Sequence, residues 1–159
     1  MTAPARKVAT NPAGVAAPIR PYYSNCVKVA AGSSLLFLSG QVGMDPQGRI
    51  VGGDAGSQTR QAIENLRVML VANGATLDDV VRVTVYVTDM RHFEEVAAPR
   101  LKAFPANGPS STIVEVRALA IPGLLVEIDA VAVLPDPAKP KRATAKRQTP
   151  RRPVRRTRR

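Results

Sequence analysis

The pattern of apolar and polar positions divides the chain into three parts. Residues 1–20 are rich in alanine and proline and show no periodicity, so we expect a flexible N-terminal arm. Residues 21–134 contain strand-like and helix-like patterns and form the predicted domain. Residues 135–159 contain five prolines and only four apolar residues. Such a segment cannot bury enough surface to offset its ordering entropy, which predicts a disordered tail.

Runs of apolar and β-branched residues predict the strands. Val81, Val83, Val85 and Val87 alternate with polar or aromatic residues, which is typical of a strand with two different faces. The sequence Ala31-Gly32-Ser33 between the first two runs favours a hairpin. The predicted strands cover residues 26–30, 34–39, 80–87, 111–117 and 125–133, with a short one at 49–51.

Two regions predict helices. Residues 54–73 space their apolar side chains by three and four positions, with Asp54 placed to cap the start and Asn73-Gly74 to end the helix. Pro99 interrupts the second region, so we expect a turn over 90–95 and a helix from about Pro99 to about Phe104. This order predicts an α+β fold, a mixed β-sheet with two helices packed on one face.

The last predicted strand indicates that the second face of the sheet is also covered. Residues 125–133 are apolar on both sides except for Glu127 and Asp129. If helices cover one face, self-association is the simplest way to bury the other. Coverage by loops and by the N-terminal arm is the alternative.

The positive charge of the chain is concentrated in its tail. The formal net charge is +11, and residues 135–159 contribute 11 cations and one acid to it. The domain is therefore nearly neutral, which excludes a domain with a broadly basic face. In the tail, prolines alternate with cations and no aromatic residue is present, a composition that favours non-specific contact with nucleic-acid phosphates. A solubilising extension is the alternative.

Composition and motifs also narrow the location and the chemistry. One cysteine, Cys26, rules out an internal disulfide. The chain has no apolar run long enough to span a membrane and no signal-peptide pattern, so we expect a cytoplasmic protein without membrane contact. The motifs HExxH, CxxC and GxxxxGK are absent, so we expect no metal site and no phosphate-binding loop.

Three features remain as candidate chemistry, although each alone can be structural. Ser39-Gly40 follows an apolar run, and glycine there permits a close approach of the backbone. Ser110-Ser111-Thr112 place hydroxyl groups at the start of a strand. Glu127 is a carboxylate in an apolar strand, which is costly unless it is paired, hydrogen-bonded or used.

Together these features resemble the RidA (YjgF, L-PSP) family. The resemblance covers about residues 21–134 and implies a chorismate-mutase-like fold and a homotrimer with ligand clefts between its subunits. It also implies hydrolysis of reactive enamines and imines to 2-keto acids and ammonia, without a metal or an organic cofactor. Ribonuclease activity is a weaker alternative, because no acid/base pair is apparent. The segments that carry the resemblance are Pro21-Tyr22, LFLSGQVGMDPQGRIVGGD, NGATLDDVVRVTVYVTD, STIVEVRALA and VEIDAVAV.

The resemblance also implies site residues. Glu127 corresponds to the residue thought to position or activate the hydrolytic water. Ser111 stands where deaminating members have an arginine that holds the substrate carboxylate. A cysteine of the family corresponds to Ile113, and a tyrosine of its second helix to Arg100. The other substrate-binding residues that it implies are retained: Tyr22, Ser39, Gly40, Phe93 and Thr112.

The serine at position 111 leaves two questions about function. We expect the pocket to persist with a substrate other than 2-aminoacrylate, because a serine cannot replace a guanidinium. Arg100, Lys102 and Arg117 are candidate substitutes for the cation, although the simpler interpretation is that all three are solvated surface cations. The alternative function is a non-catalytic trimer that binds or senses a small molecule, with its tail on nucleic acid.

Overall fold

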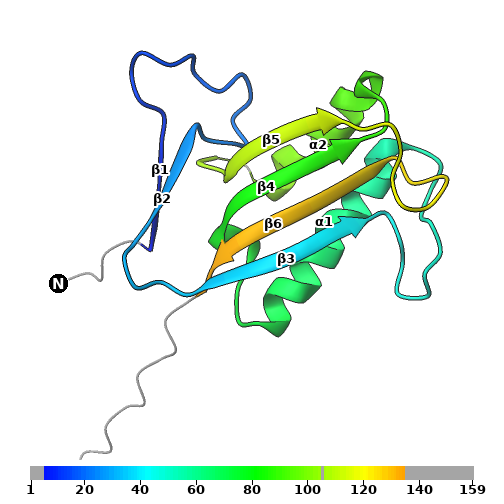
Figure 1. Cartoon of the computed structure of the whole chain (residues 1–159), viewed down its shortest axis with the longest axis horizontal. Coiled ribbons are helices and arrows are strands. Elements are labelled where there is room, and N and C mark those ends of the chain that lie inside the picture. Colours follow the sequence, from blue (N-terminus) through cyan, green and yellow to red (C-terminus); the bar gives the residue numbers. More distant parts are fainter. Residues whose placement is uncertain (1–5, 105, 135–159) are drawn as a thin grey trace, which may run out of the picture.

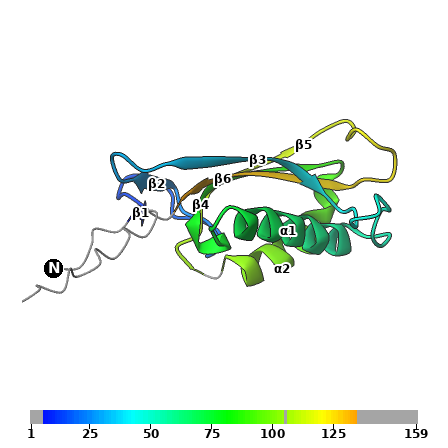
Figure 2. The same ribbon diagram turned by 90° about the horizontal axis from the view of Figure 1, so that it is seen from below.

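The computed structural model describes residues 6–104 and 106–134. Four strands form a mixed sheet in the order β3-β6-β4-β5, in which β4 and β5 are parallel and the other neighbours antiparallel. Both α-helices cover one face of this sheet, and the opposite face is open (Figures 1 and 2). The predicted α+β fold is therefore confirmed. The elements are β1 (Lys7–Thr10), β2 (Cys26–Val29), β3 (Leu35–Val42), α1 (Ala55–Ala72), the 3-10 turn η1 (Leu77–Asp79), β4 (Val80–Val87), the 3-10 turn η2 (Met90–His92), α2 (Phe93–Ala103), β5 (Ser110–Glu115) and β6 (Val126–Val133).

The first helix and the central strand form as their patterns predicted. The Asp54 side chain accepts a hydrogen bond from the Ser57 amide at the start of α1, and Gly74 follows its end with a φ of +73°. Val83, Val85 and Val87 of β4 are buried in the core beneath the helices, whereas Arg82 is exposed. The register of β4 and β6 shifts between Val80 and Arg82, so Val80 takes the place predicted for Val81 in this core. The core between sheet and helices is therefore mostly aliphatic. Its residues come from positions that repeat every 3.6 residues along the helix and every two residues along the strand.

The second helix begins earlier than predicted and contains Pro99. It starts at Phe93, and the predicted start near Pro99 is wrong. Proline cannot donate a backbone hydrogen bond to the carbonyl of Glu95. That carbonyl lies close to Gly56 of α1, where an added Cβ atom would be 3.3 Å from the oxygen. The ring of Pro99 is itself buried. Tertiary packing thus keeps a helix that the local sequence disfavours.

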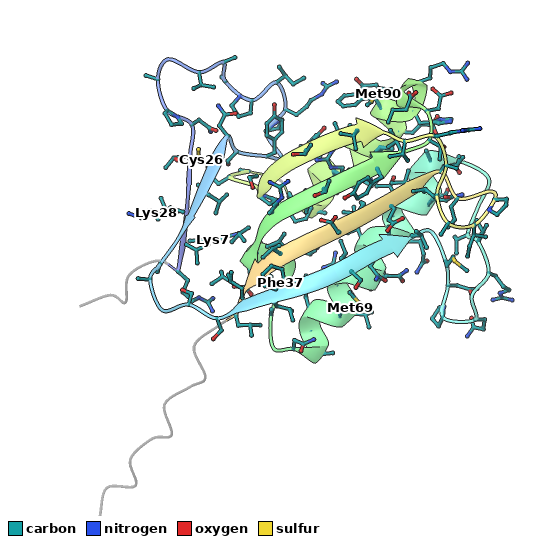
Figure 3. The ribbon with its side chains drawn as sticks, in the orientation of Figure 1. Lys7, Cys26, Lys28, Phe37, Met69 and Met90 are labelled. Atoms are coloured by element: carbon teal, nitrogen blue, oxygen red, sulfur yellow. The ribbon has the colours of Figure 1, made fainter. Side chains whose placement is uncertain are left out.

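The N-terminal region also differs from the prediction. A flexible arm over residues 1–20 is wrong for Lys7–Thr10, which forms β1 and pairs with β2. The predicted hairpin of residues 26–30 with 34–39 is also wrong, because β3 pairs with β6 instead. The Lys7 Nζ donates a 2.8 Å hydrogen bond to the Val80 carbonyl and attaches this ladder to β4 (Figure 3). The tail, with its predicted nucleic-acid contact, lies outside the described residues.

The open face of the sheet carries apolar side chains. Phe37 of β3 is 74% exposed and stands on this face (Figure 3). Leu35 and Val114 are exposed as well. Within the described ranges, no helix is both long and apolar enough to cross a membrane. Among the described residues, no element covers this face, which presents these apolar side chains beside polar ones such as Arg82 and Glu127.

Candidate active site

A cavity of about 140 Å³ lies at the β5 edge of the sheet, beside α2 and the segment before β2. Four of the predicted site residues meet in its wall, namely Tyr22, Phe93, Ser111 and Ile113. The remaining wall residues are Ile19, Arg20, Tyr23 and Arg100. The cavity is therefore mostly apolar and aromatic, with two guanidinium groups and the hydroxyl-bearing side chains of Ser111, Tyr22 and Tyr23.

The strand register explains how Ser111 and Ile113 reach the cavity. They lie opposite Val83 and Val85 of β4, which are buried beneath the helices. Side chains alternate along a strand, so Ser111 and Ile113 point to the helix side and Thr112 points to the open face. Thr112 is therefore not part of the cavity wall of its own chain, in contrast to the predicted site.

The start of α2 supplies the opposite wall. Phe93 and Arg100 are seven positions apart, so they lie on the same face of the helix. The Asp89 side chain fixes the turn before this helix by accepting a 2.8 Å hydrogen bond from the Arg91 amide. Hydrogen bonds from the side chain and amide of Arg91 lower the pKa of Asp89 to about 2.

Backbone contacts hold Tyr22 in place. The Ser24 amide donates to the Pro109 carbonyl at 3.1 Å. Gly108 lies so close to Tyr22 that an added Cβ atom would be 2.0 Å from the Tyr22 carbonyl oxygen. Only glycine permits this approach. The Tyr22 side chain is consequently buried at 3% exposure.

Arg100 is buried in the cavity wall rather than solvated. Its residue exposure is 3%, and its Nη2 donates a 2.5 Å hydrogen bond to the Ser111 Oγ. Its Cζ lies 4.6 Å from the centre of the Tyr22 ring, within the range of a cation–π contact. Burial lowers the pKa of the Arg100 guanidinium. Arginine nevertheless stays charged in proteins.

The other two candidate cations do not reach the cavity wall. Lys102 is exposed in a separate groove beside α1, and Arg117 is exposed after β5. The interpretation as solvated surface cations therefore holds for Lys102 and Arg117 and is wrong for Arg100. The spacing of seven residues between Phe93 and Arg100 is a signal that could have placed them on one helix face, but the predicted helix did not include Phe93.

Arg20 is a wall residue that the sequence analysis missed. Its guanidinium lies 5.7 Å from the centre of the Phe93 ring and pairs with the Glu94 carboxylate. The available signal was its position next to Pro21-Tyr22, a segment already singled out. Arg20 differs from Arg100 because its charge is already matched by an acid.

The remaining predicted residues form a second group on the open face. Glu127 lies in β6 opposite Tyr86 of β4 and Val42 of β3. The register of β3 and β6 shifts between Leu38 and Gln41. At this shift Gly40 approaches the carboxylate so closely that an added Cβ atom would lie 1.8 Å from the Glu127 Oε1. We call Gly40 and Glu127 the open-face pair.

Two more polar groups lie near this pair. Ser39 is exposed in β3 beside Gly40. The Tyr86 hydroxyl donates a 3.1 Å hydrogen bond to the Asp129 Oδ2, and this contact raises the pKa of Tyr86. Across residues 6–104 and 106–134, no three His, Cys, Asp or Glu side chains gather as they would to hold a metal ion. The polar groups here are suited to proton transfer and hydrogen bonding.

Comparisons with known proteins identify the family. The family model described as Endoribonuclease L-PSP matches residues 14–134. A RutC family protein of Pyrococcus horikoshii is 40% identical over 116 residues, which are 72% of this chain and 88% of that protein. A human protein named 2-iminobutanoate/2-iminopropanoate deaminase is 35% identical over 112 residues, 70% of this chain and 79% of that protein.

A solved structure agrees with these sequence matches. The crystal structure of a Rid family protein from Yersinia pestis has a TM-score of 0.74 and 33% identity, and it covers 82% of this chain and 100% of that chain. The chain therefore belongs to the RidA (YjgF, L-PSP) family.

Proposed function

We propose that this protein is a cofactor-independent hydrolase of small imines or enamines. The observation that carries the proposal is the combination of an apolar cavity containing a buried cation with a carboxylate held against a glycine on the same sheet. The human relative, 35% identical, has a name that states a deaminase of 2-iminobutanoate and 2-iminopropanoate. The reaction proposed for this chain is of the same kind.

The reaction needs few catalytic groups. Water adds to the imine carbon, and one of its protons moves to the imine nitrogen as the carbinolamine forms. The hydroxyl proton of the carbinolamine then moves to the amino nitrogen, so that the carbon–nitrogen bond breaks, ammonia leaves and the carbon–oxygen double bond forms. One carboxylate can accept the proton from water and return it to nitrogen. Glu127 is our candidate for this role, because Gly40 leaves room beside its carboxylate.

The cavity and the open-face pair would meet in a homotrimer with clefts between subunits. Ser111 and Arg100 lie on the helix side of the sheet, whereas Glu127 belongs to the open face. A neighbouring copy can therefore supply Glu127 to a cavity that its own chain does not complete. Association would also cover Phe37, and burial of such a side chain is worth about 1.5–3 kcal/mol.

The test is the rate of ammonia release from 2-iminobutanoate generated in the assay. We expect the full-length protein to exceed spontaneous hydrolysis and to have a trimeric mass by light scattering. Replacing Glu127 by Gln should lower the excess rate by about 10²–10⁴-fold, the usual contribution of a general acid/base group. The matched control is Glu64→Gln, which alters an exposed carboxylate on α1.

Three results would contradict parts of the proposal. A wild-type rate equal to spontaneous hydrolysis would favour a non-catalytic binding trimer instead. A Glu127→Gln variant as active as the Glu64→Gln control would remove Glu127 from the reaction. A monomeric mass with full activity would remove the cleft between subunits.

A further inference from the structure

We propose that Arg100 is the anion-binding group of the cavity and that the ligand is a small monocarboxylate with a short apolar end. The cation that holds this ligand would thus come from α2, with Ser111 of β5 as its hydrogen-bonding partner. The assignment rests on the proposed function for the reaction, whereas binding of the anion does not depend on catalysis.

The first argument is the burial of an unbalanced charge. A buried cation is costly unless an anion or several hydrogen bonds compensate it. Among the described residues, no Asp or Glu forms an ion pair with Arg100, and its buried Nε has no hydrogen-bond partner. The contacts with Ser111 and Tyr22 satisfy only part of the guanidinium. An anionic ligand in the cavity would supply the missing compensation.

The second argument is the charge of the cavity wall. Arg20 already pairs with Glu94, so it contributes little net charge to the cavity. Arg100 is left as the one unmatched charge among the eight wall residues and Glu94. One unmatched positive charge is complementary to a single negative charge. This balance favours a monocarboxylate over a dicarboxylate or a phosphorylated compound.

The third argument is the arrangement of hydrogen-bond donors. A guanidinium presents its N–H groups in a planar fork that matches a carboxylate. Ser111 accepts a hydrogen bond from Nη2 through its Oγ, which leaves its own hydroxyl proton free to donate. The hydroxyl and the guanidinium therefore form adjacent donors on one side of the cavity. A carboxylate can accept from both at once.

The fourth argument is the size and lining of the cavity. Its volume is about 140 Å³, similar to apolar protein cavities of about 150 Å³ that hold benzene. Phe93, Ile113 and Ile19 supply apolar surface in the same wall. The space therefore suits a ligand of about six or seven non-hydrogen atoms. 2-Oxobutanoate, the product of 2-iminobutanoate hydrolysis, is such a molecule.

The test measures binding of 2-oxobutanoate to the full-length protein by calorimetry. The neutral analogue butanone provides the comparison of charge. We expect saturable binding of 2-oxobutanoate by the wild type and binding at least tenfold weaker for butanone, because a charged hydrogen bond is lost. Arg100→Met should weaken 2-oxobutanoate binding by about ten- to hundredfold and leave butanone binding unchanged.

Two further variants test whether the effect belongs to Arg100 itself, rather than to any cation of α2, and whether it needs the planar guanidinium. Lys102→Met removes an exposed cation two positions along the same helix and should bind 2-oxobutanoate as the wild type does. Arg100→Lys keeps the charge but loses the planar fork, so its affinity should lie between those of the wild type and Arg100→Met. Thermal unfolding of each variant identifies any that fail to fold.

The outcomes distinguish this assignment from the proposed reaction. Equal affinity of the wild type for 2-oxobutanoate and butanone would overturn the assignment of Arg100. The absence of 2-oxobutanoate binding by the wild type would overturn it as well. Equal 2-oxobutanoate affinity of Arg100→Met and Lys102→Met would overturn it too. Binding that depends on Arg100 in a protein with no ammonia release would support this assignment and contradict the hydrolase proposal.

Discussion

The cavity and the open-face pair are built in different ways. The described wall of the cavity comes from one chain, and backbone contacts of Gly108 and Ser24 hold Tyr22 in this wall. The open-face pair lies on the sheet face that the helices leave open, where the atoms nearest to an added Cβ on Gly40 belong to the Glu127 side chain. In the proposed reaction, binding and proton transfer would therefore be carried by separate parts of this fold. A change to one part should therefore leave the property of the other part, ligand affinity or reaction rate, open to separate measurement.

The two glycines show the difference most directly. A Cβ atom on Gly108 would collide with backbone, whereas one on Gly40 would collide with the end of a side chain. Backbone cannot move without disturbing its hydrogen bonds, but a glutamate side chain can rotate away. The Gly108 contact is thus part of the folded framework, and the Gly40 contact is part of the site.

The largest expected effect is on catalysis by Gly40→Ala. The new methyl group would displace the Glu127 carboxylate, which lies 1.8 Å from its position. We expect a loss of about 10²-fold in ammonia release, close to the effect of removing the general acid/base group. Affinity for 2-oxobutanoate should stay that of the wild type. Both quantities can be measured on the same preparation.

The control for this variant is Gly53→Ala. Gly53 has no heavy atom within 4 Å of an added Cβ and no positive φ. Equal activities of the two alanine variants would show that the position of the Glu127 carboxylate does not matter. A parallel loss of 2-oxobutanoate binding in Gly40→Ala would show that the two parts are not separate.

A smaller effect, on stability, is expected for Gly108→Ala. The added Cβ atom would lie 2.0 Å from the Tyr22 carbonyl oxygen, so the backbone must shift. Overpacking of this kind costs about 1–3 kcal/mol. Thermal or denaturant unfolding measures the loss, and 2-oxobutanoate binding should weaken with it. Stability equal to that of Gly53→Ala would show that this wall of the cavity is not rigid.

The sequence predicted those parts of the fold whose signals are local. The apolar spacing of residues 54–73 and the alternation of 80–87 each depend on one element, and both were right. Pro99 misled the prediction of α2, because its cost is met by packing against α1, distant in sequence. The short β1 was missed because its strand partner lies beyond the first twenty residues.

Several candidate site residues were singled out from the sequence, but their arrangement in space was not. Tyr22, Phe93 and Ser111 were singled out, and the structure brings them into one cavity. The burial of Arg100 was not predictable, because it depends on contacts with two other elements. Glu127 was singled out as an unusual carboxylate in a strand, yet nothing in the sequence indicated that it lies on the opposite face of the sheet from Ser111 and Ile113.

The smallest expected effect concerns Asp89, which fixes the start of α2 and therefore one wall of the cavity. The pKa of Asp89 in the folded state is about 2, below the usual value of about 3.9 for an unfolded aspartate. Its contribution to stability is therefore present above about pH 4 and is lost as the pH falls through about 2. Asp89→Asn should lower the Tm slightly at pH 6, and the difference from wild type should shrink toward pH 2. Hydrogen exchange at pH 6 should become faster in the first turn of α2 and stay unchanged in β3 and β6.

Asp45→Asn is the matched control, because the hydrogen bonds from Arg49 likewise lower the pKa of Asp45 in a turn remote from the cavity. Faster exchange in α2 for both variants would mean that Asp89 has no specific hold on this wall.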